Sequence, residues 1–316
     1  MIEFQRLILG DRRRNERFAQ ALRRVIVPGE TTVADLGSGT GFLAFVASRL
    51  GAKECWLYET SELLELSREI ARENGIRNCT FVRAHSTEVV EPPRADVVVS
   101  ETLGNLALEE GIVATLQDGR RFLRPGGTMI PQRLAQLVAP VTSPRLFQAL
   151  DVWPAIGHGL DLSAARRVSL HNAYVRSIEP ADLLAGGDAT RTWDEIDLRK
   201  RESSIRRASI EWKLARPTHL FGFALWWECE LIEGAPDLVL STAPDAPRTH
   251  WEQIWLPPAH ESGPLQAAAG ETLRLELACD ARPAVKINVK WKTTLLDRGG
   301  RPRAAAVQDM RKGQLE

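Results

Sequence analysis

One segment constrains the fold of this chain more than any other: residues 33–41, which read VADLGSGTG. Residues 33–36 predict a short buried strand and residues 42–50 predict a helix, so the three glycines lie in the turn between them. Glycine adopts positive φ without steric cost, and its missing Cβ lets a ligand approach the backbone at a helix N-terminus. The segment therefore predicts a strand–turn–helix unit that binds a nucleotide-like ligand.

The spacing of the glycines narrows the class of ligand. A dinucleotide-binding turn, G-x-G-x-x-G, requires a glycine at position 42, where this chain has Phe42. NAD is therefore disfavoured. An acidic residue two positions before G-x-G-x-G resembles the loop of the S-adenosylmethionine-dependent methyltransferases. This resemblance implies that the donor is bound by Asp35, Gly37, Gly39 and Gly41.

Glu59 follows the second predicted strand, residues 55–58. A carboxylate at this place can accept two hydrogen bonds from a ribose diol. Taken alone, Glu59 is better explained as a surface residue. Because it follows the glycine loop by one helix and one strand, we expect it to bind the donor ribose.

Strands continue to alternate with helices up to about residue 130. Residues 61–74 predict a helix, and residues 80–84 and 95–100 predict the third and fourth strands. Such alternation predicts an α/β fold with a Rossmann-like doubly wound sheet, whose ligands bind at the carboxyl ends of the strands. In folds of this kind the loop after the third strand contacts the adenine amino group, a role open here to Thr87 or Glu88.

Composition excludes several classes of function. Lys+Arg and Asp+Glu number 41 each, so net charge gives no argument for nucleic acid or an anionic membrane as partner. The four cysteines are far apart in sequence and lack metal-ligand spacing. No apolar run reaches the length of a membrane span, and no export signal is apparent. A cytoplasmic protein without a bound metal is expected.

Two carboxylates follow the fourth predicted strand. Glu101 comes directly after it and Glu110 lies nine residues later, in the sequence SETLGNLALEE, with Glu109 as an extra neighbour. This resembles the double-glutamate loop of the protein arginine N-methyltransferases, S-E-x-x-G followed by apolar residues and a closing glutamate. The resemblance implies that Glu101 and Glu110 are catalytic and bind the substrate.

The chemistry explains why two carboxylates are needed. A guanidinium is a planar cation that stays protonated in water and has no free lone pair with which to attack a methyl group. Two anions can hold its edges and draw positive charge toward the held nitrogens, leaving the remaining nitrogen aimed at the donor. Positioning and electrostatics then supply most of the catalysis.

The second half of the chain has a different pattern of apolar residues. After Pro131, short apolar segments separated by turn residues predict an antiparallel β-barrel or sandwich. We expect a donor-binding domain at 1–131, including an N-terminal helix, and a substrate domain at 132–316. The tryptophans of this half are expected in its core, namely Trp226, Trp227, Trp251, Trp255 and Trp291.

Two segments of this half extend the resemblance. Thr249-His250-Trp251 matches the T-H-W loop of the arginine methyltransferases, which implies that His250 and Trp251 border the target guanidinium and that His250 is catalytic. Residues 153–167 resemble the helical arm of the family, expected here at about 145–170. The arm implies a head-to-tail homodimer.

The N-terminal segment both extends the resemblance and departs from it. Arg17 resembles in its placement an arginine that pairs with the carboxylate of the donor. The family has an aspartate ahead of that arginine that pairs with the histidine of T-H-W; Arg14 stands at that spacing here and Asp11 one turn earlier. The aromatic helix that covers the donor in the family has no counterpart, since the chain starts at Met1-Ile2-Glu3-Phe4.

These features predict an S-adenosylmethionine-dependent N-methyltransferase that acts on the guanidinium of arginine, in a peptide or protein or as free arginine. A small-molecule N-methyltransferase of a natural-product pathway is the first alternative, because the aromatic helix that covers the donor in the family is missing. Thr102, Leu103 and Asn105 also predict a differently shaped acceptor channel, which leaves the substrate open. A catalytically silent scaffold that binds the donor is the alternative from another class.

Overall fold

A parallel sheet forms the first half of the molecule. The structure, a computed structural model, describes residues 2–258 and 263–313. Five parallel strands lie in the order β3-β2-β1-β4-β5. Their bounds are Thr32–Leu36 for β1, Glu54–Tyr58 for β2, Cys79–Val82 for β3, Ala95–Val99 for β4 and Leu123–Ile130 for β5. The order changes direction between β1 and β4, and open α/β sheets bind ligands at such a point.

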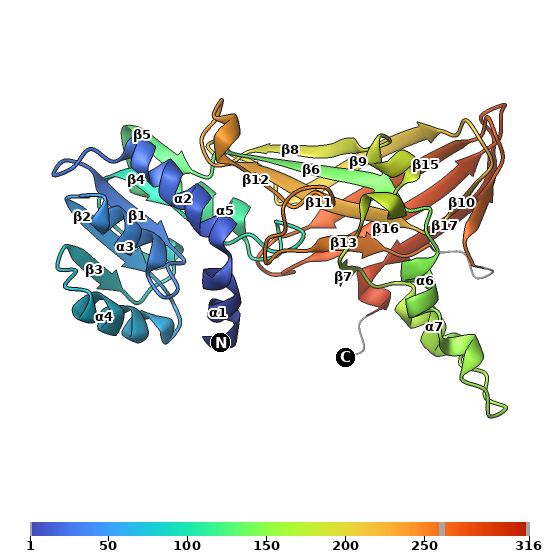
Figure 1. The fold of residues 1–316 in the computed structure, drawn as a ribbon, viewed down its shortest axis with the longest axis horizontal. Helices are drawn as coiled ribbons and strands as arrows, with labels where there is room; N and C mark the ends of the chain where they lie inside the picture. Colours follow the sequence, from blue (N-terminus) through green and yellow to red (C-terminus); the bar gives the residue numbers. More distant parts are fainter. Residues whose placement is uncertain (1, 259–262, 314–316) are drawn as a thin grey trace.

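Helices cover this sheet on both faces. They are α2 (Arg12–Val25), α3 (Phe42–Arg49), α4 (Leu63–Glu73) and α5 (Ile112–Gly119). A short helix α1, Ile2–Gly10, precedes α2 and points away from its end (Figure 1). Strand β4 is buried along nearly its whole length, as expected of a central strand covered on both faces. The α/β class predicted from the sequence is confirmed.

Antiparallel strands form the second half, which lies beside the first (Figure 1). One sheet has the order β7-β13-β11-β6-β8 with β12 paired to β11, a second has the order β17-β16-β15-β9, and β10 pairs with β14. The bounds are Arg133–Pro140 (β6), Tyr174–Arg176 (β7), Arg191–Asp197 (β8), Ile205–Lys213 (β9), Thr218–Leu220 (β10), Phe223–Glu230 (β11), Val239–Ser241 (β12), Gln253–Leu256 (β13), Leu265–Ala267 (β14), Thr272–Asp280 (β15), Asn288–Leu296 (β16) and Pro302–Asp309 (β17).

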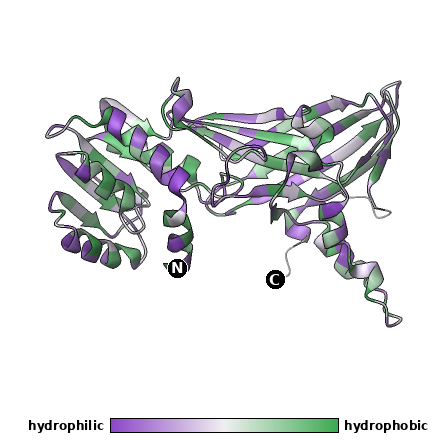
Figure 2. Ribbon diagram, viewed as in Figure 1, coloured by the Kyte–Doolittle hydropathy of each residue, from purple (hydrophilic) through white to green (hydrophobic). Residues whose placement is uncertain are grey.

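The core of the second half is rich in tryptophan. Buried and partly exposed residues alternate along β15, and Figure 2 shows the matching change of hydropathy along the strands. All five tryptophans expected in the core are buried, and Trp227, Trp255 and Trp291 are the largest of the fully enclosed side chains. The parallel sheet ends at Ile130 and the antiparallel part starts at Arg133, on either side of Pro131.

A helical arm projects from the antiparallel half (Figure 1). It contains α6 (Arg145–Leu150), a 3-10 turn at Trp153–Ala155 and α7 (Ser163–Ser169). The Arg166 guanidinium pairs with the Asp151 carboxylate at 2.6 Å and ties the two ends of the arm together. Within the described residues, no helix combines the length and the apolar character needed to cross a bilayer.

Candidate active site

A cavity of about 400 Å³ lies at the carboxyl edge of β1, β2 and β4. Residues from the glycine turn, from the end of β2 and from the loop after β4 face this one space, although they are far apart in sequence. Of the residues expected from sequence to form the site, its lining includes Gly37, Gly39, Glu59, Glu101 and Glu110. The parallel sheet therefore brings the expected donor loop and the two expected carboxylates to the same cavity.

The three glycines of the turn differ in what their missing side chains leave room for. Gly37, Gly39 and Gly41 all adopt positive φ, at 74°, 53° and 85°. Gly37 and Gly39 line the cavity, whereas Gly41 does not. A Cβ on Gly41 would lie 2.4 Å from the Ser67 hydroxyl oxygen and 2.6 Å from the Phe45 ring. Gly41 thus lets α3 pack against α4, and its expected contact with the donor stays a prediction.

Asp35 also has a structural role that differs from the expected one. Its side chain is buried and does not line the cavity. One carboxylate oxygen accepts a hydrogen bond from the Ala44 amide at 3.1 Å, so Asp35 satisfies an otherwise unpaired N–H in the first turn of α3. Burial raises the pKa of this carboxyl to about 7. Asp35 thus stabilises the start of α3, directly after the glycine turn, and does not line the cavity.

Glu59 lies at the cavity wall as expected. Its two carboxylate oxygens accept hydrogen bonds from the Gly39 amide at 2.9 Å and from the Ser61 amide at 2.8 Å. These bonds fix the carboxylate against the glycine turn while each oxygen keeps a second lone pair. Glu59 thus stands next to the glycine turn, and its expected bond to the donor ribose stays a prediction.

The loop after β3 presents other residues than those expected. Glu88 turns back so that its carboxylate accepts a hydrogen bond from the His85 amide at 2.8 Å, and the Thr87 hydroxyl contacts the His85 ring at 2.7 Å. The cavity is instead lined by Ala84, His85 and Ser86. Thr87 and Glu88 do not line the cavity, because this segment forms a 3-10 turn and sequence alone does not tell which side of such a turn faces a crevice. Their expected contact with the adenine stays a prediction.

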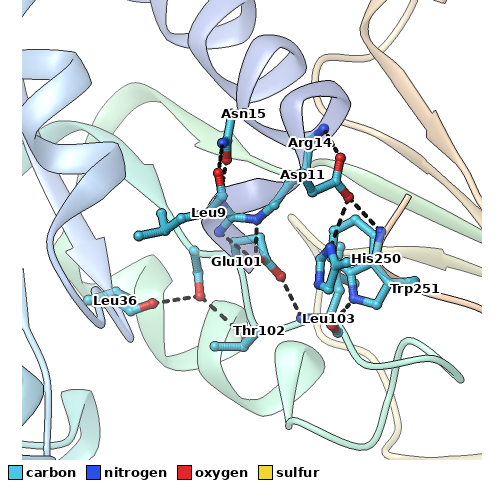
Figure 3. Close-up of polar contacts among 11 residues, drawn as sticks. Leu9, Asp11, Arg14, Asn15, Leu36, Glu101, Thr102, Leu103, His250 and Trp251 are labelled. Atoms are coloured by element: carbon cyan, nitrogen blue, oxygen red, sulfur yellow. Dashed lines mark hydrogen bonds and ion pairs between the residues drawn. The ribbon is translucent and has the colours of Figure 1, made fainter. Parts of the chain in front are cut away.

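The arginine of the site is Arg14 and not Arg17. The Arg17 guanidinium donates a hydrogen bond to the Gln20 side chain at 3.0 Å and does not line the cavity. One helical turn earlier, Arg14 holds one oxygen of the Glu101 carboxylate, with its Nε at 2.7 Å and Nη2 at 2.5 Å (Figure 3). Both side chains are almost fully buried, at 6% and 5% exposed. Arg17 thus lies outside the cavity lining, one turn of α2 beyond the arginine that contacts Glu101, and its expected contact with the donor stays a prediction.

The second carboxylate has a different environment. Glu110 is exposed to the cavity, whose walls nevertheless withdraw enough solvent to raise the pKa of its carboxyl to about 7. The negative charges of Glu101 and Glu109 add to this effect, and Arg14 opposes it. Within the described residues, no hydrogen bond to the Glu110 carboxylate is found. Glu101 is thus held in place by a cation, whereas Glu110 is left free to receive one.

The expected T-H-W loop reaches the N-terminal helices. One Asp11 carboxylate oxygen accepts hydrogen bonds from the His250 amide at 2.8 Å and from the His250 ring Nδ1 at 2.9 Å (Figure 3). Burial opposes ionisation of Asp11, but the hydrogen bonds from His250 and from the Arg14 amide outweigh it and lower the pKa of Asp11. Asp11 is therefore the carboxylate partner of His250, and it stands three residues before Arg14, which is the spacing expected between this aspartate and the arginine.

Trp251 is hydrogen-bonded to the backbone of the double-glutamate loop. Its indole N–H donates a hydrogen bond to the Leu103 carbonyl oxygen at 2.6 Å, and Trp227 donates in the same way to the Gly104 carbonyl oxygen at 3.0 Å. The two indole rings contact each other edge to face, with centroids 4.9 Å apart. Neither His250 nor Trp251 lines the cavity described above. The role of Trp227 was missed because nothing local in the sequence distinguishes it from other core tryptophans.

Helix α1 lies against the cavity, which the sequence, lacking the aromatic N-terminal motif, did not indicate. Phe4, Gln5 and Ile8 of α1 line it, and the Gln5 side chain lies 3.2 Å from where a Cβ on Gly39 would stand. A hydrogen bond from the Asn15 side-chain amide to the Leu9 carbonyl oxygen, at 2.8 Å, stabilises the junction between α1 and α2. A short helix of ordinary composition thus takes the covering position without the aromatic motif.

Known proteins share both halves of this architecture. Residues 134–293 match the family model of the arginine methyltransferase oligomerization subdomain, and residues 29–155 match that of a methyltransferase domain. A solved structure, the Trypanosoma brucei PRMT1 enzyme-prozyme heterotetrameric complex with AdoHcy, has the same fold with a TM-score of 0.82 at 21% identity, covering 97% of this chain and 96% of the other.

Relatives with curated names agree with these matches. Probable protein arginine N-methyltransferase 6 of Arabidopsis thaliana is 26% identical over 294 residues, which cover 78% of this chain and 66% of the relative. Protein arginine N-methyltransferase 1 of Dictyostelium discoideum is 27% identical over 242 residues, which cover 74% of this chain and 70% of the relative. The chain thus spans about two thirds of the length of these relatives. Because the oligomerization subdomain alone matches half of it, the chain belongs to the protein arginine N-methyltransferase family.

Proposed function

We propose that this chain transfers a methyl group from S-adenosylmethionine to a guanidinium nitrogen of arginine. One observation carries the proposal: the glycine turn with Glu59 and the carboxylates Glu101 and Glu110 open into the same cavity. A donor bound along the turn and a cation held by the carboxylates would share that space. Group transfer requires this proximity.

The residues of the donor side fit S-adenosylmethionine. Gly37 and Gly39 leave the backbone of the turn open to a ligand, and the fixed Glu59 carboxylate suits a ribose diol. Phe4 and Ile8 of α1 supply an apolar cover over the same space. The donor would contribute an electrophilic methyl group on sulfur, and the protein would contribute its position and exclude water from it.

The acceptor side fits a planar cation. Glu101 is already oriented by Arg14 and by the Leu103 amide, which donates to its other oxygen at 3.1 Å. Glu110 offers a carboxylate without a hydrogen-bonding partner among the described residues. A guanidinium bound between the two would gain charge-assisted hydrogen bonds and have one nitrogen left for attack.

His250 is assigned to the border of this acceptor site. Asp11 accepts from its Nδ1, which makes Nδ1 the protonated nitrogen and leaves Nε2 to accept a proton. Loss of a proton from the methylated guanidinium would come late, after the new bond forms. Trp251 contributes indirectly, by holding the backbone of the loop that carries Glu101.

Incubation with isotopically labelled S-adenosylmethionine, free arginine and an arginine-rich peptide tests the proposal, with mass spectrometry of both acceptors. We expect label on arginine nitrogen, and the preferred acceptor separates a protein methyltransferase from a small-molecule enzyme. Glu101→Gln and Glu110→Gln should each lower turnover at least about a hundredfold. The control Glu228→Gln changes a half-buried glutamate of β11 and should retain activity.

Calorimetry of donor binding accompanies these assays, because Glu101→Gln also breaks a buried ion pair. Donor binding without methylation of any arginine compound would contradict the proposal and favour the silent scaffold. Near-normal turnover in both glutamate variants would remove these residues from the mechanism.

We also infer a cytoplasmic homodimer. The arm supports the dimer, since Val152, Ile156 and Leu160 expose 48%, 43% and 67% of their surface on it. All four cysteines are free thiols, which agrees with a reducing compartment.

A further inference from the structure

A third carboxylate lies inside the double-glutamate loop. Glu109, which directly precedes Glu110, directs its side chain back into the loop and not toward the cavity. One of its oxygens accepts a hydrogen bond from the Asn105 amide at 2.8 Å and the other from the Leu106 amide at 2.8 Å. Because both oxygens serve as acceptors, the ionised form suits this site. Burial outweighs these bonds and raises the pKa of Glu109.

The backbone of the loop is built around this carboxylate. A Cβ on Gly104 would lie 2.2 to 2.6 Å from the Glu109 side-chain atoms, so only glycine leaves room for them. Ala107 adopts a positive φ of 66°, which is unfavourable for alanine. Gly104 and Ala107 face each other across an isolated bridge. The chain between Glu101 and Glu110 therefore turns tightly over Glu109.

The same turn is the part of the loop that forms hydrogen bonds with the antiparallel half. The Gly104 carbonyl oxygen accepts from the Trp227 indole at 3.0 Å, and the Asn105 side chain accepts from the Glu252 amide at 2.8 Å. Glu252 follows directly after the T-H-W segment. A change at Glu109 would thus alter the contact between the two loops expected to surround the acceptor.

Charge is the second route by which Glu109 acts on Glu110. The charged groups that face Glu110 are Glu101, Glu109 and Arg14. Arg14 is already paired with Glu101, so Glu109 contributes a nearby negative charge that no cation of the described residues neutralises through a salt bridge. A like charge disfavours ionisation of its neighbour.

We propose that Glu109 is a positioning residue of the methyltransferase site: it folds the loop that presents Glu101 and Glu110, and its negative charge, together with that of Glu101, repels the Glu110 carboxylate. The inference rests on the proposed function of the two glutamates. In the acceptor-free site burial, with the charges of Glu101 and Glu109 added, raises the pKa of Glu110 to about 7. A cationic acceptor removes the repulsion, so its binding releases the proton of Glu110.

Two variants separate the positioning effect from the charge effect. Glu109→Gln keeps the length and one acceptor oxygen but loses the charge. Glu109→Asp keeps the charge but is too short to reach both amides. The titration of Glu110 is followed by NMR in the full chain labelled with 13C-glutamate, with Glu110→Gln identifying the resonance. We expect Glu109→Gln to lower the titration midpoint of Glu110 by roughly half a pH unit or more, and Glu109→Asp to leave it near the wild-type value.

Kinetics provide the second measurement. Both variants should lower kcat about tenfold or more, because displaced carboxylates no longer align the acceptor, while donor affinity changes less than about twofold. The control Glu228→Gln should alter neither the midpoint nor kcat.

Unchanged titration of Glu110 in Glu109→Gln, or unchanged kcat in Glu109→Asp, would overturn the inference. A wild-type midpoint close to that of an ordinary glutamate would do the same. If the wild-type chain methylates no arginine compound, the proposed function fails, but the titration needs no turnover and still tests Glu109. Should Glu109→Gln not fold, the kcat of Glu109→Asp decides the positioning role.

Discussion

Glu101 and Glu110 face one cavity but have unlike electrostatic surroundings. Glu101 is bound to the buried Arg14 guanidinium, whose cation orients it and offsets its charge. Glu110 has two carboxylates near it and a pKa of about 7. A single arginine therefore separates the roles of two residues of the same type. One is fixed before the acceptor arrives, and the other responds to the positive charge of the acceptor.

This difference predicts the pH dependence of the reaction. The parameter kcat/KM reports ionisations of the free enzyme, and the acceptor requires Glu110 ionised. A carboxyl with a pKa of about 7 is mostly protonated at pH 6 and mostly ionised at pH 8. We expect kcat/KM to rise about tenfold from pH 6 to pH 8. The rise in kcat should lie at lower pH, because the bound cation favours the carboxylate.

Steady-state kinetics between pH 5 and pH 9 measure both parameters. Glu110→Gln serves as the control, since its residual activity should lack this acidic limb. A wild-type kcat/KM that stays flat from pH 6 to pH 8 would contradict the assignment of Glu110.

At the scale of elements, the unit β1–turn–α3 divides its glycines between ligand space and packing. Gly39 faces the cavity and the flexible Gln5 side chain of α1, which can move. Gly41 is enclosed by Phe45 of its own helix and by Ser67 of α4. Glycine is thus needed at position 39 to leave space for a ligand and at position 41 to let two helices pack.

Matched alanine substitutions test this division. Gly41→Ala adds a clash at 2.4 Å to an unfavourable positive φ, so we expect the free energy of unfolding to fall by roughly 2–4 kcal/mol. Gly39→Ala should lower it by only about 1–2 kcal/mol, the cost of positive φ. Its donor affinity should fall about tenfold or more, since the new methyl group occupies space meant for the ligand.

Denaturant unfolding and calorimetry of donor binding distinguish the two variants. The division would be wrong if Gly41→Ala were as stable as wild type, or if Gly39→Ala bound the donor with unchanged affinity.

At the scale of the whole molecule, long-range contacts join the two halves around the cavity. Asp11 binds His250, Arg14 binds Glu101, and Trp227 and Trp251 hold the loop after β4. The arm projects outside this joined body (Figure 1). Its apolar residues Val152, Ile156 and Leu160 are exposed. Such side chains are expected to be covered by a second copy of the chain.

The proposed dimer depends on these side chains. The double variant Ile156→Glu, Leu160→Glu places two charges on the arm without disturbing a buried residue, because both positions are exposed. We expect sedimentation analysis to give the mass of a monomer for this variant and of a dimer for the wild-type chain. Val307→Glu, which changes an equally exposed apolar residue of β17, should remain dimeric. A dimeric double variant or a monomeric wild type would contradict the proposal.

The sequence by itself determined the features that depend on residues close together in the chain, namely the order of strands and helices and the residues at the strand ends. Alternation of strands and helices indicated the parallel sheet, and the carboxyl ends of its strands had to bring Gly39, Glu59 and Glu101 to one edge. The resemblance of SETLGNLALEE to the double-glutamate loop indicated Glu110. These inferences succeed because strand direction and side-chain periodicity follow from local sequence.

Tertiary structure decided which side chains of these elements meet. Arg14 and Glu101 are 87 residues apart, and Asp11 and His250 are 239 apart, so the turn of α2 that faces the site is set by how the halves pack and not by motif spacing. The same holds for α1 over the cavity, for the inward turn of Glu109 and for the tryptophans behind the loop. Each is selected by the burial and hydrogen bonding that only the assembled fold provides, and sequence distance carries no information on either.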